Sequence, residues 1–465
     1  MNVIICFAAL GLLIFLAYRG HSVILAAPVA ALFAVVLTSP SAVPAAFSGL
    51  YMEKLATFVR LYLPVFVLGA LFGKLIEVSG AARSIVSAIT AWFGARHAIL
   101  SVSVVGMLLT YGGVSVFVVV FAVYPFAAEM FRQADIPKRL LPATIAFSAF
   151  TITMDALPGT PQIQNIIPTA FFGTTAYAAP VLGVLTSMFV FGLCFAYLRW
   201  RQAAAAARGE GYGSGHSNEP DPETSASAIP VWLAMFPLLC VGIGNIVILR
   251  ILNSAFSEQV TADLNPGTGT APIVQSLKAN AAIWAVEGAL LLGIVLAIVI
   301  GWKTIRRNFT ETSKAAVSGS LLASLNTASE YGFGGVIAAL PGFSQIVGGL
   351  SGISNPLLNA AVLVNVLCAV TGSASGGLSL ALGALGERFS AAATADGIPL
   401  EVMHRIASLA SGGMDTLPHN GAIITLLAVT GMTHRQVYKD IFAITVVKTL
   451  AAFFAITVFY STGLV

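Results

Sequence analysis

A five-residue string, Met-Asp-x-Leu-Pro, occurs twice in this chain, and each copy interrupts a long apolar stretch. The two copies place Asp155 and Asp415 260 residues apart. The same shift superposes further residues in one ungapped register from about 111 to 162: Gly112 on Gly372, Ser115 on Ser375, Leu140 on Leu400 and Ser148 on Ser408. This pattern indicates an internal duplication. Secondary transporters use duplicated halves with broken helices at matching positions to build a binding site near the bilayer midplane.

The composition places the chain in a lipid bilayer. Hydrophobic residues make up 57% of the chain and charged residues only 9%, which is too few charges to solvate a globular surface of this size. Several uncharged stretches approach the length that crosses about 30 Å of hydrocarbon; they include residues 3–18, 23–37, 181–197 and 288–302. The 4 cysteines lie within apolar segments without metal-ligand spacing. We therefore expect no metal, no cofactor and no nucleic-acid partner.

The positions of Lys and Arg predict the membrane topology, because these residues accumulate in cytoplasmic loops. Two basic loops, 199–208 and 303–314, are therefore expected in the cytoplasm. The chain crosses out and back between them, through about 230–251 and 281–302. Residues 253–278 then form an external loop, and both termini are predicted to be periplasmic.

Loops at equivalent positions of the two halves differ in charge. The basic loop 132–139 corresponds to the mixed loop 386–401, the uncharged loop 173–178 to the basic loop 433–439, and the basic stretch 83–97 to the uncharged stretch 343–357. All three pairs swap polarity. This favours halves that are inverted about an axis in the membrane plane over parallel copies.

We therefore predict an all-α polytopic membrane protein of two inverted repeats. Each repeat is expected to contain about five transmembrane helices, one of them broken, and a re-entrant hairpin. The first repeat covers residues 1–200 and the second 229–465. Residues 201–228, rich in Gly, Pro and Ser, read as a flexible cytoplasmic linker. The helices and hairpins are expected near 2–18, 22–38, 56–80, 98–128, 140–173 and 178–200, and near 229–252, 280–302, 316–348, 357–385, 400–432 and 437–461.

The predicted hairpin tips, 111–115 and 371–377, carry small polar residues in the middle of apolar runs. Glycine permits a sharp reversal there. Backbone that is unpaired at membrane depth must be buried in protein or line a polar cavity. We therefore expect the tips to contribute to a substrate site, through Gly113, Ser115, Ser373 and Ser375. The alternative is that small residues let straight helices pack closely.

The helix breaks point to an anion site. Proline suits the first turn of a new half-helix, and the free amides of that turn, together with the helix dipole, attract negative charge. The residues expected to bind a substrate at the breaks are Pro158, Gly159, Thr160, Gln162, Asn165, His419 and Asn420. The expected ligand is a small organic carboxylate.

Asp155 and Asp415 have two possible roles. An acid inside a membrane span is a candidate proton carrier or part of a cation site; alternatively, each satisfies amides exposed by the break. His419 is a further candidate for carrying a proton, with a structural role equally open. Lys448 either balances an acid, draws in anions, or forms a structural ion pair or snorkelling contact.

Several motifs resemble the gluconate permease (gluconate:proton symporter) family of the ion transporter superfamily, and the likeness covers most of the chain. They are Gly-Ala-Leu-Phe-Gly-Lys-Leu-Ile-Glu-Val-Ser-Gly-Ala-Ala at 69–82, Tyr-Gly-Gly-Val-Ser-Val-Phe at 111–117, Leu-Pro-Gly-Thr-Pro at 157–161, Thr-Gly-Ser-Ala-Ser at 371–375, and Ser-Gly-Gly-Met-Asp-Thr-Leu-Pro at 411–418. The resemblance implies a bacterial inner-membrane symporter for sugar acids or short hydroxy acids. It also implies proton coupling, a homodimer and elevator-type transport.

The chain departs from this family's pattern at two places. Gluconate-transporting members have an acid where this chain has Gly112, and His-Gly-x-Leu-Pro-Pro-His-Pro where it has residues 154–161. This favours a smaller monocarboxylate, such as 3-hydroxybutyrate. A sodium-coupled carboxylate carrier is the alternative, because carbonyls at the hairpin tips suit a hard cation. An enzyme is not expected, since no metal-ligand cluster or nucleophile–base spacing is present. A channel is disfavoured because broken helices in inverted halves suit alternating access.

Overall fold

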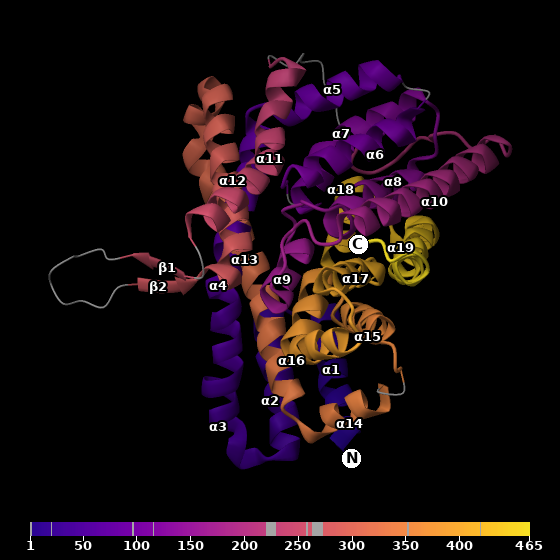
Figure 1. Cartoon of the computed structure of the whole chain (residues 1–465). Helices are drawn as coiled ribbons and strands as arrows, with labels where there is room; N and C mark the ends of the chain where they lie inside the picture. The colour runs from indigo at the N-terminus through magenta and orange to yellow at the C-terminus, as the bar shows by residue number, and fades with distance from the viewer. Residues whose placement is uncertain are drawn as a thin grey trace.

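The computed structural model of the chain is almost entirely helical (Figure 1). It describes residues 2–19, 21–94, 97–114, 116–219, 229–256, 259–262, 273–350, 353–418 and 420–465. Among these residues, 5 helices are long and apolar enough to cross a membrane: 40–78, 180–206, 231–255, 280–300 and 434–462. The chain is therefore a multi-pass membrane protein.

The first half of the chain begins with long helices and continues with shorter, interrupted ones. Its elements are α1 (Asn2–Tyr18), α2 (Val23–Thr38), η1 (Pro40–Ala42), α3 (Val43–Ala45), η2 (Ala46–Tyr51), α4 (Met52–Val78), α5 (Ala81–Phe93), α6 (Ala98–Tyr111), α7 (Val116–Gln133), η4 (Lys138–Leu140), α8 (Leu141–Ala149), η5 (Ile152–Ala156), α9 (Ile163–Phe172) and α10 (Pro180–Ala206).

The second half has a similar order of helices. Its elements are α11 (Val231–Ala255), β1 (Gln259–Ala262), β2 (Ile273–Ser276), α12 (Leu277–Ile300), α13 (Trp302–Ala338), α14 (Pro341–Leu350), α15 (Pro356–Thr371), α16 (Ala374–Ala395), α17 (Leu400–Gly413), α18 (Gly421–Thr430) and α19 (His434–Thr462). The hairpin α15–α16 therefore corresponds in order to α6–α7, and the pair α17–α18 to α8–α9.

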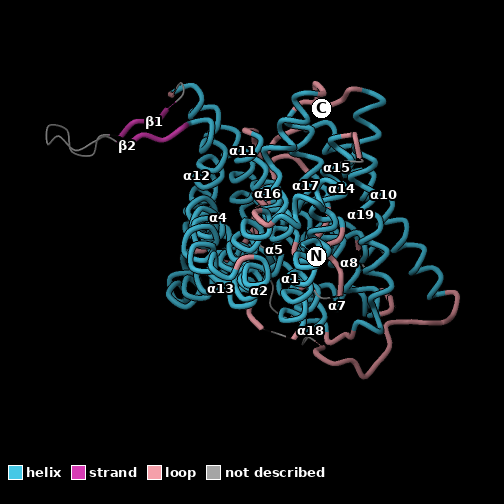
Figure 2. The backbone as a smooth tube through the Cα atoms, turned by 90° about the horizontal axis from the view of Figure 1, so that it is seen from below, coloured by secondary structure: helices cyan, strands magenta, loops and turns pink. Residues whose placement is uncertain are grey.

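Two groups of helices lie side by side (Figures 1 and 2). The frame helices are α1, α2, α4, α11, α12 and α13; within them, α13 packs along α4 and α2, and α12 packs along α11 and α4. The interrupted bundle contains the hairpins, the pairs α8–α9 and α17–α18, and the long helices α10 and α19. The contact between α13 and α16 joins the two groups.

Two helices of the interrupted bundle are enclosed by protein. Every residue of α8 is buried, as is nearly all of α17, including His404 and Arg405. The frame helices leave large apolar side chains exposed, such as Leu25 at 68%, Trp232 at 69% and Val299 at 66%, and so does α10 of the bundle, with Met188 at 66%. An exposed apolar face of this kind requires lipid.

Four features differ from the sequence-based expectations. A small antiparallel β-hairpin, β1–β2, pairs Gln259 with Ser276 and Ala262 with Ile273, so an all-α fold is wrong in this detail; the hairpin projects away from the helices (Figure 1). The short helices α5 and α14 were not expected. Helix α13 begins at Trp302, well before the predicted start at residue 316. The prediction missed its first turns because they are charged and exposed, and hydropathy does not reveal such turns.

The segment expected to be a flexible linker is tied to the helices as far as it is described. Helix α10 continues to Ala206, inside the expected linker. Beyond it, Glu219 pairs with Lys138 and Arg132 at 2.6 Å each, and Tyr212 donates a hydrogen bond to Glu219 at 3.0 Å. Arg139 donates hydrogen bonds to Glu210 and thereby holds the pKa of that carboxyl below its ordinary value. Residues 208–219 therefore clamp one end of the interrupted bundle.

Candidate functional site

Both Met-Asp-x-Leu-Pro strings lie where a helix is interrupted. Asp155 is part of η5, a single π-helical turn between α8 and α9, and Asp415 lies between α17 and α18. The sequence predicted that the prolines start the new half-helices, and this is wrong, because α9 begins at Ile163 and α18 at Gly421. Residues 157–162 instead form a loop with a turn at residues 158–159, held by the hydrogen bond from the Gly159 amide to the Ala176 carbonyl.

Lys448 brings the two acids together. Its Nζ lies 2.8 Å from Asp415 Oδ1 and 3.7 Å from Asp155 Oδ2. All three side chains are at most 6% exposed, so the charges compensate one another away from solvent. We call Asp155, Asp415 and Lys448 the charge triad. It joins an acid from each half of the chain to α19.

Asp155 is the less constrained of the two acids. Its Oδ2 is buried and accepts no hydrogen bond within the described residues, whereas Asp415 receives the short bond from Lys448. Gly412 of α17 makes room for the Asp155 carboxylate, since a Cβ at that glycine would lie 1.6 Å from Oδ2. A glycine in the second half of the chain thus leaves space for an acid of the first half.

Arg405 and His404 of α17 were not identified as site residues from the sequence. Arg405 is fully buried and donates to the carbonyl oxygens of Ala178 at 2.7 Å and Asp155 at 3.3 Å, and to Asn165 Oδ1 at 3.0 Å. His404 contacts Thr174 Oγ1 at 2.6 Å. The duplication offered a signal for Arg405, since the same shift of 260 residues places it on the apolar Ile145.

Each helix break binds its own hairpin tip. Gln162 Nε2 donates to the carbonyls of Thr110 at 2.8 Å and Val114 at 3.2 Å. In the second half, Asn420 Nδ2 donates to the carbonyl of Gly372 at 2.8 Å. The Thr110 carbonyl also accepts a hydrogen bond from the Gly113 amide. The side-chain amides therefore add donors to backbone carbonyls of the hairpin turns, which must be satisfied at membrane depth.

The other predicted site residues divide into four sets. Thr160 and Asn165 direct their donors to backbone carbonyls, of Thr153 and of Thr160 and Ala176, and so hold the first break in shape. Pro158 accepts a hydrogen bond from Tyr111 Oη at 3.1 Å, which ties the same break to the first hairpin. Gly113 lies at the first tip, and Ser373 and Ser375 lie at the second, where Ser373 caps α16. Ser115 and His419 lie outside the described residues.

Glu330 of α13 is a further buried acid that the sequence reasoning missed. It is 5% exposed, and its Oε2 is buried without a hydrogen-bond partner in the described part of the chain. It faces the second hairpin, where a Cβ at Gly376 would lie 1.5 Å from Oε2. The signal was present in the sequence, because Glu330 is the only charged residue between Lys314 and Glu387.

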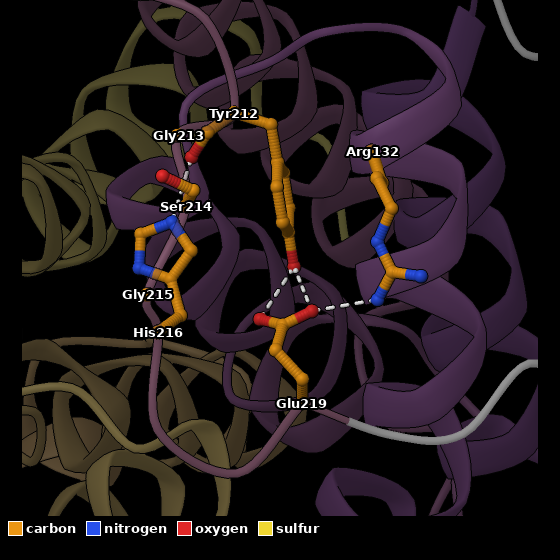
Figure 3. A pocket seen from close by; sticks show the side chains of 7 residues that line it. All are labelled: Arg132, Tyr212, Gly213, Ser214, Gly215, His216 and Glu219. Carbon is orange, nitrogen blue, oxygen red and sulfur yellow. Dashed lines mark hydrogen bonds and ion pairs between the residues drawn. The ribbon is translucent and has the colours of Figure 1, made fainter.

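A cavity of about 370 Å³ opens at the surface, beside the clamped segment 208–219 (Figure 3). It is lined by Arg132, Tyr212, Gly213, Ser214, Gly215, His216 and Glu219. Its charged groups already pair with each other, as Arg132 does with Glu219. The charge triad, in contrast, is closed to solvent, so the surface cavity and the buried charges are separate features.

Membrane-spanning helices, two interrupted helices and buried charges between them define a polytopic membrane transporter. Residues 1–300 match the family described as GntP family permease. The chain is 52% identical over 478 aligned residues to the "Uncharacterized transporter YxjC" of Bacillus subtilis (strain 168), with 100% of both chains covered. The chain belongs to the GntP family of permeases. The family resemblance expected from the sequence is confirmed, and the protein is a transporter rather than an enzyme.

The fold is similar to that of a solved transporter. The crystal structure of the Alcanivorax borkumensis YdaH transporter matches with a TM-score of 0.55, covering 90% of this chain and 88% of that one. Sequence identity in this comparison is 16%, so the likeness concerns the fold alone.

Proposed function

We propose that the protein is a proton-coupled symporter for a small organic carboxylate. Its substrates are short hydroxy acids such as 3-hydroxybutyrate, or gluconate-like sugar acids. The observation that carries this proposal is the charge triad, in which Lys448 lies between Asp155 and Asp415. Membrane-buried acids that lie between interrupted helices are typical of proton and substrate pathways.

Charge compensation explains the coupling. The triad carries one surplus negative charge when ionised, and Arg405, bonded to the Asp155 carbonyl, offsets it. A bound monocarboxylate adds a negative charge, which is costly to move through hydrocarbon. A proton taken up with the substrate restores neutrality. We assign this proton to Asp155, whose Oδ2 accepts no hydrogen bond among the described residues and lies 3.7 Å from Lys448, with Asp415 as its partner through Lys448.

The proposed substrate site lies between the helix breaks and the hairpin tips. The residues proposed to line it are Gly113, Ser373 and Ser375 at the tips, and Pro158, Gly159, Gln162 and Asn420 at the breaks. Ser115 and His419, outside the described residues, are kept as candidates from the sequence. Thr160 and Asn165 contribute by holding the first break in place. The N-terminus of α18, where Asn420 caps the amides of Ala422 and Ile423, supplies the positive end of a helix dipole toward a carboxylate.

The proposed transport cycle is of the elevator type. The two halves are inverted repeats, and the interrupted bundle moves as a unit against the frame helices, which remain in the membrane as a homodimer. The contact of α13 with α16 supports this division, because it lies where the two groups meet. In this proposal the protein lies in the bacterial inner membrane, with both termini in the periplasm and the segment 201–228 in the cytoplasm.

The test is uptake by purified protein in proteoliposomes. A panel of radiolabelled carboxylates, including 3-hydroxybutyrate and gluconate, is offered with an imposed proton or sodium gradient. We expect saturable accumulation that is driven by an inward proton gradient, collapses with a protonophore and is indifferent to sodium. Accumulation that requires sodium contradicts proton coupling.

The sodium-coupled carrier remains the second candidate. It is favoured by the hydroxyl groups at the second hairpin tip, where Thr327 Oγ1 lies 3.4 Å from Ser375 Oγ and Ser375 Oγ lies 3.5 Å from Ser373 Oγ. Such oxygens suit a hard cation. The sodium arm of the same experiment separates the two candidates.

A further inference from the structure

The contact between α13 and the second hairpin contains an acid, Glu330, that no ion pair compensates within the described residues. Glu330 is buried against Gly376, and the absence of a side chain at that glycine is what leaves room for the carboxylate. Thr327 lies one turn earlier on the same face of α13 and contacts Ser375 at the hairpin tip. The side chains at this junction therefore come from a frame helix and from the hairpin that packs on it.

Charged and titratable groups around Glu330 do not neutralise it. Tyr51 of η2 and Cys368 of α15 lie within its electrostatic reach, and neither is a cation. Lys54 of α4 packs against Gly335, further along α13, and no ion pair joins it to Glu330 within the described residues. Helices α2 and α14 carry no charged residue. Glu387 and Arg388 lie about three turns beyond Gly376 on α16.

Glu330 differs in this respect from the other buried charges of the bundle. Asp155, Asp415, Lys448 and Arg405 sum to zero and contact one another directly or through the backbone. An ionised Glu330 adds one negative charge for which the described part of the chain offers no counterion. A lone buried carboxylate costs several kcal/mol or takes up a proton instead.

We infer that Glu330 is a proton-binding site that controls the contact of the second hairpin with α13. In the closed arrangement seen here the carboxyl is protonated, and the tip of α16 packs against it. Loss of that proton to solvent leaves a charge that requires water, so the hairpin must draw away from α13. The part of this inference that concerns hairpin movement rests on the proposed transport function; proton binding at Glu330 does not.

Infrared difference spectroscopy of purified protein in lipid tests proton binding without any substrate, because a protonated carboxyl has a carbonyl band that a carboxylate lacks. The variants are Glu330→Gln and, as a matched control on the same helix, Glu311→Gln, whose side chain is 81% exposed. We expect a band in wild type and in E311Q that disappears as pH rises, with one component missing in E330Q. A pH-dependent band identical in all three proteins overturns the inference.

Cross-linking tests the second step. Thr327→Cys and Ser375→Cys are introduced together, and the disulfide between these positions is quantified by mass spectrometry across a range of pH. At high pH we expect less cross-linking in the protein that keeps Glu330 than in the E330Q variant. The thiol chemistry is the same in both proteins, so the difference reports on Glu330. Equal pH profiles in both backgrounds overturn the control of the hairpin by Glu330. If E330Q loses the infrared component but uptake by wild type does not depend on protons, the proposed symport is refuted. The proton-binding site at Glu330 is then still supported.

Discussion

Lys448 compensates two acids that come from different halves of the chain. Its ammonium is 2.8 Å from Asp415 and 3.7 Å from Asp155. The close pair resembles a structural ion pair. In the proposed mechanism the longer contact lets Asp155 change its protonation state at a smaller cost to the fold.

Replacing Lys448 by methionine is expected to destabilise the protein. Breaking one side of a buried ion pair typically costs about 3–5 kcal/mol, because it leaves an uncompensated charge. We expect a lower apparent unfolding temperature for Lys448→Met in detergent, followed by tryptophan fluorescence. The double variant Lys448→Met with Asp415→Asn removes both charges of the close pair and should recover part of the loss. If the single variant unfolds at the wild-type temperature, the ion pair has no structural role.

Asp155→Asn is expected to fold and insert normally but to lose concentrative uptake. Lys448 keeps its short bond to Asp415 in this variant, while the proposed proton site is gone. The measurement compares proton-driven accumulation with substrate exchange at equal pH, and exchange should survive. Asp396→Asn, in an exposed loop, serves as the matched control. Proton-driven accumulation at the wild-type level in Asp155→Asn would remove Asp155 from the coupling mechanism.

At the scale of elements, side chains from the breaks donate hydrogen bonds to backbone carbonyls of the hairpin turns. Gln162 alone serves two carbonyls, of Thr110 and Val114. This bond network makes the hairpin and the broken helix one unit.

Gln162→Ala should loosen the first hairpin. The Val114 carbonyl loses the Gln162 donor, while the Thr110 carbonyl keeps its bond from the Gly113 amide. A buried carbonyl that loses its partner costs about 1–3 kcal/mol, so a lowered unfolding temperature and faster hydrogen exchange in residues 108–114 are expected. The isosteric Gln162→Glu cannot donate to either carbonyl when ionised and should show the same loss. Unchanged exchange in both variants would show that water, rather than Gln162, satisfies these carbonyls.

The clamped segment 208–219 predicts a pH-dependent contribution to stability. Burial raises the pKa of the Glu219 carboxyl, but hydrogen bonds from Lys138 and Arg132 outweigh it and hold the pKa below its ordinary value. Because the folded pKa is depressed, this contribution is present above the ordinary carboxyl pKa and is lost as pH falls through the folded one. Glu219→Gln should therefore lower the unfolding temperature at neutral pH and have less effect in acid. Glu311→Gln, on an exposed pair, should change neither.

At the scale of the whole molecule, the proposed topology places the clamped segment and the start of α13 on one side of the membrane and the β-hairpin on the other. Three exposed positions report on it: Ser214→Cys, Glu311→Cys and Gln275→Cys. With an impermeant maleimide added to intact spheroplasts, we expect labelling at 275 alone. Labelling at 214 or 311 before lysis would contradict the orientation.

Local sequence and hydropathy determined the membrane location, the positions of the helix interruptions and the family of this protein. Low charge and long apolar runs require a bilayer, the repeated Met-Asp-x-Leu-Pro marks both interruptions, and the motifs at 69–82 and 411–418 indicate the permease family. These properties depend on residues close together in the chain. The start of a helix with charged, exposed first turns, such as α13, was not predicted. Hydropathy indicates which residues lie in lipid and does not indicate how long a helix is.

Only the tertiary structure decided which charges meet. Asp155 and Arg405 are 250 residues apart and come into contact because α17 packs on the first break. Glu330 can pack against the neighbouring helix α16 because Gly376 has no side chain there. Sequence shows that an acid is present, but its partner depends on how helices from both halves pack. That packing leaves Lys448 between two acids and Glu330 with no cation among the described residues.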